Sequence, residues 1–410
     1  MRTYRELFRT PEFTPLFLAS TGQVAAQTVS GLALGTQVYT ATGSPLLSAL
    51  AMFGPSLTQV IGAATLLSAA DRLPPRAALT GLSVLFGLGT AAQAVPGLSV
   101  AAVFAIVLGL GVVSALGGGV RYGLLNEVLD KEGYLLGRSV LNMSTGTVQI
   151  CGFAVGGVLT TLASPRGTLL IGAALYLVGA TIARLGLSRR MPRATGQPSV
   201  AETWRNNGRL WSSKPRRYVY LALWVPNGLI VGCESLYVPY APRHAGLLFA
   251  CGALGMLVGD TLAGRFVPQR WREQLGVPLC LLLAAPFLVF PLHPALPLAA
   301  AAVALATVGY SASLLLQERL ISLTPDELSG HALGLHSSGM LTMQGVGATL
   351  AGAVAERTSP ATAMAVMAAT SLAVTLSLAP GLRPPARRTS EPVGLRKRAS
   401  PELTHEDAGK

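Results

Sequence analysis

Long apolar stretches, separated by short clusters of charged and turn-forming residues, follow one another along almost the whole chain. A helix needs about 20 apolar residues to cross a bilayer. Segmenting the chain at its charges, prolines and turn residues predicts twelve such helices. They cover 14–40, 45–70, 76–95, 98–125, 138–163, 167–187, 216–241, 246–267, 274–292, 295–318, 331–355 and 360–381. The pattern predicts an all-α polytopic membrane protein.

The composition agrees with this prediction. Of the 410 residues, 51% are hydrophobic and 12% are charged, whereas a soluble domain has about 25% charged residues. So few charges cannot cover a soluble surface of this size, and the lipid bilayer is the expected surrounding. The net charge is +13, but the basic residues form short clusters between apolar segments. They form no continuous patch, which excludes nucleic acid as a partner.

The basic residues also predict the topology. With the N-terminus in the cytoplasm, the outer loops receive only Arg166, Arg243 and Arg357, and all other Lys and Arg residues fall on the inner side. This asymmetry is the positive-inside rule for twelve spans with both termini cytoplasmic. We expect the protein in the plasma membrane. Because arginine far outnumbers lysine and Ala and Gly are abundant, we expect that membrane to be a bacterial inner membrane.

The charged loop that follows the second span has a counterpart later in the chain. A constant offset of 193 residues relates positions in two loops and two helices, among them Arg72 and Arg265, Pro75 and Pro268, Gly137 and Gly330, Gly146 and Gly339, and Gly152 and Gly345. We interpret this as a parallel repeat of six spans. Repeats of this kind place a substrate site between the halves, near the middle of the membrane.

The repeat predicts four parts of the chain. Residues 1–187 form an N-terminal six-helix bundle, 188–214 a cytoplasmic linker, 215–381 a C-terminal six-helix bundle, and 382–410 a disordered basic tail. In the linker, Val200, Trp204 and Trp211 share one face of a possible helix, with arginines opposite. This pattern indicates an interfacial amphipathic helix, and a plain flexible linker is the alternative.

The loop "LSAADRLPPR" resembles the G-x-L-A-D-R-x-G-R-R loop of the major facilitator superfamily, and the resemblance extends from Arg9 to Gly381. It implies the major facilitator fold and transport by alternating access. In this family the loop closes the cytoplasmic gate. The resemblance therefore implies gate residues in the two loop copies and beside them, namely Asp71, Arg72, Arg76, Asp260, Arg265 and Arg270.

Two further stretches narrow the resemblance. "LQERLISLTPDELSGHALGLHSSGMLTMQGVGATLAGAVAE" and "LLNEVLDKEGYLLGRSVLNMSTGTVQICGFAVGGVL" resemble the branch of siderophore exporters and macrolide efflux pumps. Exporters often have G-P-x-x-G-G in the fifth helix, and this chain has Phe153 in place of the proline. The export assignment thus depends on the branch resemblance more than on that motif.

Polar residues inside the predicted spans are the first candidates for a substrate site, because such residues are costly in lipid unless they pair or face water. Gln23, Gln27, Ser30 and Gln37 recur at helical spacing in the first span. The fifth span has Asn142 and Gln149, and the eleventh has His336 and Gln344. We expect these residues to line a cavity between the halves. Hydrogen bonding between helices, worth about 0.6 kcal/mol per bond, is the alternative.

The seventh span has "PNG" at 226–228 near its middle. Proline and glycine there predict a discontinuous helix with free carbonyl groups, which indicates a binding site that includes Asn227. Glu234 follows two turns later on the same face. A carboxylate removed from water binds a proton readily, so Glu234 is a candidate for proton coupling. The alternatives are that it pairs permanently with a cation or reaches the outer membrane interface, one or two turns away. Asp260 is the second candidate, but for it a gate salt bridge with Arg265 is the favoured interpretation and proton transfer is the alternative.

The sequence has no HExxH, P-loop or nucleophile-elbow motif and no metal-ligand pattern, so we expect neither an enzyme nor a cofactor. The combined prediction is a monomeric secondary transporter that exports a hydrophobic or amphipathic small molecule in exchange for protons. A facilitative or uptake carrier is the alternative within this class. A transport-inactive membrane sensor or scaffold, and finally a membrane enzyme, are the alternatives outside it.

Overall fold

The computed structural model describes residues 4–70, 73–129, 131–192, 200–325 and 328–382. Asp71, Arg72 and the predicted tail at 383–410 lie outside these ranges. The described part contains helices and turns and no strand. Its helices are α1 (Tyr4–Arg9), α2 (Phe13–Thr42), α3 (Pro45–Ala70), α4 (Pro75–Gln93), α5 (Val100–Val128), α6 (Lys131–Leu162), α7 (Ser164–Gly186), α8 (Val200–Ser212), α9 (Lys214–Ser235), α10 (Tyr237–Tyr240), α11 (Ala245–Arg265), α12 (Gln269–Ala284), η1 (Ala285–Leu292), α13 (Leu296–Val308), η2 (Gly309–Ser311), α14 (Ala312–Ser322), α15 (Ser329–Arg357), α16 (Pro360–Leu378) and η4 (Ala379–Leu382).

Local sequence signals set the turns between the long helices. Gly43 ends α2 in the left-handed region, with φ of 66°, where glycine carries no steric penalty. The Ser99 hydroxyl caps α5 by accepting the Ala102 backbone N–H at 3.2 Å. Ser359 caps α16 in the same way at 3.1 Å. Each cap satisfies a backbone donor that has no partner within its helix.

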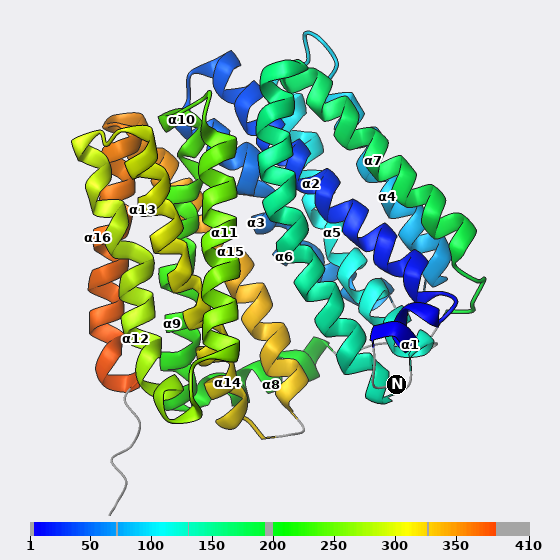
Figure 1. The fold of residues 1–410 in the computed structure, drawn as a ribbon. Coiled ribbons are helices and arrows are strands. Elements are labelled where there is room, and N and C mark those ends of the chain that lie inside the picture. The colour runs from blue at the N-terminus through cyan, green and yellow to red at the C-terminus, as the bar shows by residue number, and fades with distance from the viewer. Residues whose placement is uncertain (1–3, 71–72, 130, 193–199, 326–327, 383–410) are drawn as a thin grey trace, which may run out of the picture.

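The long helices form two bundles that lie side by side (Figure 1). The N-bundle comprises α2–α7 and the C-bundle comprises α9–α16. We call the two ends of the molecule the α10 end, where the α2–α3 turn also lies, and the α8 end, where α1 lies (Figure 1). Helix α8 packs on α9 and α15 of the C-bundle, so the structure has a helix in the linker, where the sequence left an amphipathic helix and a plain flexible linker equally open.

The bundles meet through the helix pairs α3–α15, α6–α11 and α2–α10. Contacts between them include the stacked rings of Phe153 and Phe249, 4.5 Å apart, and the Tyr39 hydroxyl, which donates to the Pro239 carbonyl at 3.4 Å. Each of these residues lies toward the α10 end of the molecule. The α3–α15 and α6–α11 pairs correspond to each other under the sequence repeat, so the repeat produces two similar contacts.

Glycines allow the close approach of α6 and α11. A Cβ atom on Gly157 would lie 2.7 Å from the Gly246 Cα, closer than real side chains come, so these two helices touch backbone to backbone. At the α3–α15 contact, Gly345 faces Leu57 and Gly352 faces Leu46 with similarly little room. Small residues that bring backbones together are the usual means of helix association in membranes.

Eight helical segments of the described chain are long and apolar enough to cross a membrane. They are Pro45–Gly62, Val100–Val128, Ser164–Gly186, Lys214–Tyr240, Ala245–Arg265, Gln274–Leu292, Leu296–Ser322 and Pro360–Leu382. The other four predicted spans coincide with α2, α4, α6 and α15. Within α6, the described apolar segment Thr147–Leu162 is shorter than a full span.

Candidate functional site

Near the α8 end of the N-bundle, a polar pair joins α2 and α5. The Arg121 guanidinium donates through Nη2 to the Gln23 Oε1 at 2.8 Å. The Arg121 Nε is buried and has no hydrogen-bond partner. Gly117, one turn earlier on α5, lies beside the Gln23 amide, and a Cβ there would be in ordinary van der Waals contact with Gln23 Nε2 at 3.9 Å. The sequence indicates Gln23 as a candidate, but not its pairing with Arg121.

The remaining polar residues of α2 have different surroundings. Gln27 is exposed, whereas Ser30 is buried where α2 packs on Gly172 of α7. Gln37 donates to the Gln93 carbonyl of α4 at 3.0 Å. The helical spacing of these residues does not give them a shared environment, because α2 meets different neighbours along its length. On α6, Gln149 is half-buried, and Asn142 lies two turns before it.

A second polar pair joins α9 and α15 of the C-bundle. Gln344 donates through Nε2 to the Asn227 Oδ1 at 3.1 Å, and Asn227 is buried. On α15, two turns from Gln344, His336 is 3% exposed and its Nδ1 has no partner. The His336 backbone carbonyl accepts the Trp224 indole N–H at 3.0 Å. The structure thus brings Asn227 and Gln344 together, and the buried His336 also faces into the C-bundle.

The predicted break in the seventh span does not occur, because α9 is one continuous helix through Pro226. Gly228 instead packs against the backbone of α15 at Met343 and Gly347, with no space for a side chain. Gly228 therefore allows α9 and α15 to approach closely, and it does not unwind α9. Non-α segments occur elsewhere in the described spans: η1 follows α12 in the ninth predicted span, and η2 interrupts the tenth between α13 and α14.

This η2 segment places Tyr310 next to Glu234. The Tyr310 hydroxyl donates to the Glu234 Oε1 at 3.0 Å, and Tyr310 is 9% exposed. Within the described ranges, no Lys, Arg or His nitrogen lies within ion-pair distance of the Glu234 carboxylate. Sequence reasoning did not identify Tyr310. The sequence feature that could have identified Tyr310 is its hydroxyl group in the middle of an apolar span, next to Gly309.

Four of the six predicted gate residues lie in the described ranges, on α4, α11 and α12. Arg76 and Arg270 lie in the first turns of α4 and α12. Asp260 and Arg265 are both exposed on α11, and the expected ion pair between them is not formed among the described residues. Five residues apart, they lie on different faces of the helix.

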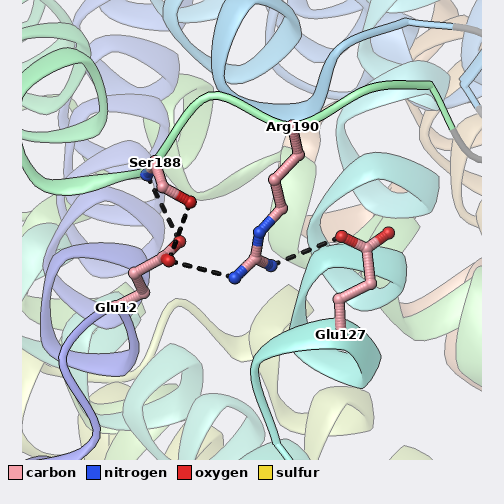
Figure 2. Close-up of polar contacts among 4 residues, drawn as sticks. All are labelled: Glu12, Glu127, Ser188 and Arg190. Atoms are coloured by element: carbon pink, nitrogen blue, oxygen red, sulfur yellow. Dashed lines mark hydrogen bonds and ion pairs between the residues drawn. The ribbon is translucent and has the colours of Figure 1, made fainter.

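Two ion-pair networks at the α8 end were not predicted from the sequence. In the C-bundle, Arg272 of α12 pairs with Glu318 of α14 at 3.1 Å. In the N-bundle, Arg190 contacts Glu12 at 3.0 Å and Glu127 at 3.3 Å (Figure 2). The Ser188 hydroxyl also donates to Glu12 at 2.8 Å. This second network ties the start of the linker to the ends of α2 and α5.

Comparison with known proteins identifies the class. Residues 16–314 match the sequence profile of the Major Facilitator Superfamily, so the chain belongs to this family. No curated protein matches the chain. The family and its structural neighbours indicate a transporter, and not an enzyme. The structure is that of a multi-pass membrane protein with several apolar spans.

Several solved structures share the fold. A bacterial homologue of the human lysosomal transporter Spinster, in an inward-facing and unoccupied conformation, has a TM-score of 0.69 at 14% identity, covering 93% of this chain and 96% of that one. The nucleoside transporter NupG has a TM-score of 0.70 at 14% identity, covering 91% and 99%. A POT family transporter in complex with a thioalcohol-conjugated peptide has 0.70 at 12% identity, covering 90% and 96%.

Proposed function

We propose that this protein is a secondary active transporter that exports a hydrophobic or amphipathic small molecule in exchange for protons. The four helices α2, α4, α6 and α15 complete twelve spans with the eight apolar segments. Both termini and α8 lie in the cytoplasm, and the protein is a monomer in a bacterial inner membrane. The resemblance to siderophore exporters and macrolide efflux pumps supports the direction of transport.

With this topology, the arrangement of the two bundles is inward-facing. Contacts such as Gly157 with Gly246 and Phe153 with Phe249 lie toward the α10 end, which is then the outer end. Alternating access requires that these contacts open while the bundles approach each other at the α8 end. The inward-facing conformation of the Spinster homologue supports this interpretation.

The observation that carries the proton-coupling proposal is the environment of Glu234. A carboxylate inside the membrane is expensive unless it is paired or protonated. In the described structure Glu234 has a hydrogen bond from Tyr310 and no cationic partner. Gain and loss of a proton at Glu234 would therefore change the charge next to η2, where the tenth span departs from α-helical geometry. We assign Glu234 as the proton-responsive group and Tyr310 as the residue that positions it.

The test is substrate-triggered proton release from inside-out vesicles with an imposed pH gradient, screened over a compound panel. We expect release by the wild type and its loss in Glu234→Gln. Asp260→Asn is the matched control, since Asp260 is an exposed carboxylate without a described partner. Loss of release in Asp260→Asn, with release intact in Glu234→Gln, would assign coupling to Asp260.

The positioning role of Tyr310 has its own control. Tyr310→Phe removes the hydroxyl that reaches Glu234, whereas Tyr237→Phe removes a buried hydroxyl with no partner. We expect lower proton release in the first variant and unchanged release in the second. Equal effects of both variants would show that the hydroxyl on Tyr310 has no particular role.

A further inference from the structure

Arg121 is a cation that the proposed proton coupling does not use. It lies seven residues before the end of α5 at Val128, about 10 Å along the helix at 1.5 Å per residue. It lies about one turn inside the predicted span 98–125, and its Nε is buried within the N-bundle, so the guanidinium is removed from water. An arginine at such a depth is costly and needs an anionic or polar partner.

The described partners of Arg121 do not balance its charge. Its one described hydrogen bond goes to the neutral Gln23 amide oxygen, and its Nε is buried without an acceptor. No described carboxylate lies within ion-pair distance of Arg121. Glu12 and Glu127, at the same end of the N-bundle, are held by Arg190 (Figure 2). The guanidinium has more donors than its surroundings use.

The surroundings of Arg121 suit an anion in other ways. Gln23 accepts from Arg121 through its oxygen, which leaves its amide N–H groups free to donate alongside the guanidinium. Gly118, within one turn on α5, has no atom within 4 Å of the position a Cβ would take. A guanidinium binds a carboxylate through two parallel hydrogen bonds. Arg121 and Gln23 together thus offer a donor set from two helices, with open space nearby.

We propose that Arg121 and Gln23 bind the anionic group of the transported molecule, which makes the substrate an amphiphile with a carboxylate or similar anion. This inference rests on the proposed transport function, because it assigns the substrate class of the same protein. Arg121 provides charge and a bidentate geometry, and Gln23 orients the guanidinium and adds an amide donor.

The test compares two probes that differ in one group, 1-pyrenebutyrate and 1-pyrenebutanol. Binding to the full chain in phosphatidylcholine nanodiscs is measured by energy transfer from tryptophan to pyrene. We expect the wild type to bind the carboxylate more tightly than the alcohol by roughly ten- to a hundredfold, the value of a charge-assisted hydrogen bond. Arg121→Gln should lose this preference, and Arg121→Lys should retain part of it.

Arg138→Gln is the matched control, because it removes the same charge from the same bundle. Arg138 stacks on the Tyr122 ring at 5.4 Å and should leave the carboxylate preference unchanged. A wild type without preference, or a preference that survives in Arg121→Gln, would overturn the proposal. If phosphatidylglycerol in the nanodiscs displaces pyrenebutyrate in an Arg121-dependent way, the anion site belongs to a lipid headgroup and the substrate assignment is wrong.

This assay separates the two proposals because it needs no gradient. A carboxylate preference that depends on Arg121 supports the anion site even if no compound releases protons. Absence of proton release for every compound would contradict the transport function and leave the anion site standing. Proton release by uncharged compounds, in a protein without the carboxylate preference, would overturn the anion site and leave the transport function intact.

Discussion

The backbone contact between α6 and α11 allows a quantitative prediction about alternating access. In this structure a Cβ on Gly157 would lie 2.7 Å from the Gly246 Cα, and one on Gly246 would lie 3.1 Å from the Phe153 carbonyl oxygen. Both helices present backbone at this point, so no flexible side chain is there to move aside. Replacing either glycine by alanine should force the two bundles apart at the α10 end.

The size of the effect follows from the packing. Overfilling a close-packed contact costs about 1–3 kcal/mol, and the cost arises only in the conformation in which the contact is closed. A bias of that size changes the ratio of two conformations by roughly 5- to 150-fold. Gly246→Ala should therefore shift the population from the arrangement seen here toward one that is open at the α10 end.

The shift can be measured as a distance between the bundles. Spin labels at Pro96→Cys and Ala295→Cys, on a cysteine-free background, give the distance between the two bundles at the α10 end by double electron–electron resonance. We expect longer distances to gain population in Gly157→Ala and in Gly246→Ala. The matched control is Gly118→Ala, because a Cβ there meets nothing within 4 Å.

Two results would refute this reasoning. An unchanged distance distribution in both variants, with the protein folded, would mean that the α6–α11 contact does not limit opening. The same shift in Gly118→Ala would mean that any added methyl group changes the ensemble, and that the contact has no special role.

Three further predictions concern stability. Gly228→Ala should lower the thermal stability by about 1–3 kcal/mol, because the added methyl group collides with the α15 backbone, and a thermal unfolding scan measures this. A double-mutant cycle of Asn227→Ala with Gln344→Ala should give a coupling energy of about 0.6 kcal/mol in unfolding, and a value near zero would contradict the hydrogen bond. Arg190→Gln should cost about 1 kcal/mol or less, since both of its ion pairs are partly exposed, whereas Arg189→Gln, an exposed neighbour, should have no effect on the unfolding temperature.

The architecture could be predicted from the sequence because the bilayer leaves few alternatives. Every backbone group within lipid must be satisfied inside its own segment, so long apolar stretches must be helices. Most predicted and observed helices begin and end within a few residues of each other. The exceptions are α6, which begins seven residues earlier, at Lys131, and α12, which begins five residues earlier, at Gln269, and ends at Ala284, where the 3-10 segment η1 begins. The 193-residue repeat accounts for the similarity of the α3–α15 and α6–α11 contacts.

The details of the site could not be predicted in the same way. Pro226 and Gly228 indicated a broken helix, yet Gly228 serves the contact with α15 and the helix continues. Spacing along one helix shows which residues share a face, but not which neighbour covers that face at each depth. Ser30 therefore lies against α7, and Tyr310 reaches Glu234 from a helix 76 residues away in sequence.

Proton coupling through Glu234 is tested most directly by comparing uphill transport with exchange in the same proteoliposomes. A compound that releases protons from the wild type is used, and Glu234→Gln is the variant. We predict that the variant still exchanges labelled for unlabelled substrate but does not accumulate substrate against its gradient when a pH gradient is imposed. Uphill accumulation that persists in Glu234→Gln would contradict the assignment of Glu234 as the proton-responsive group.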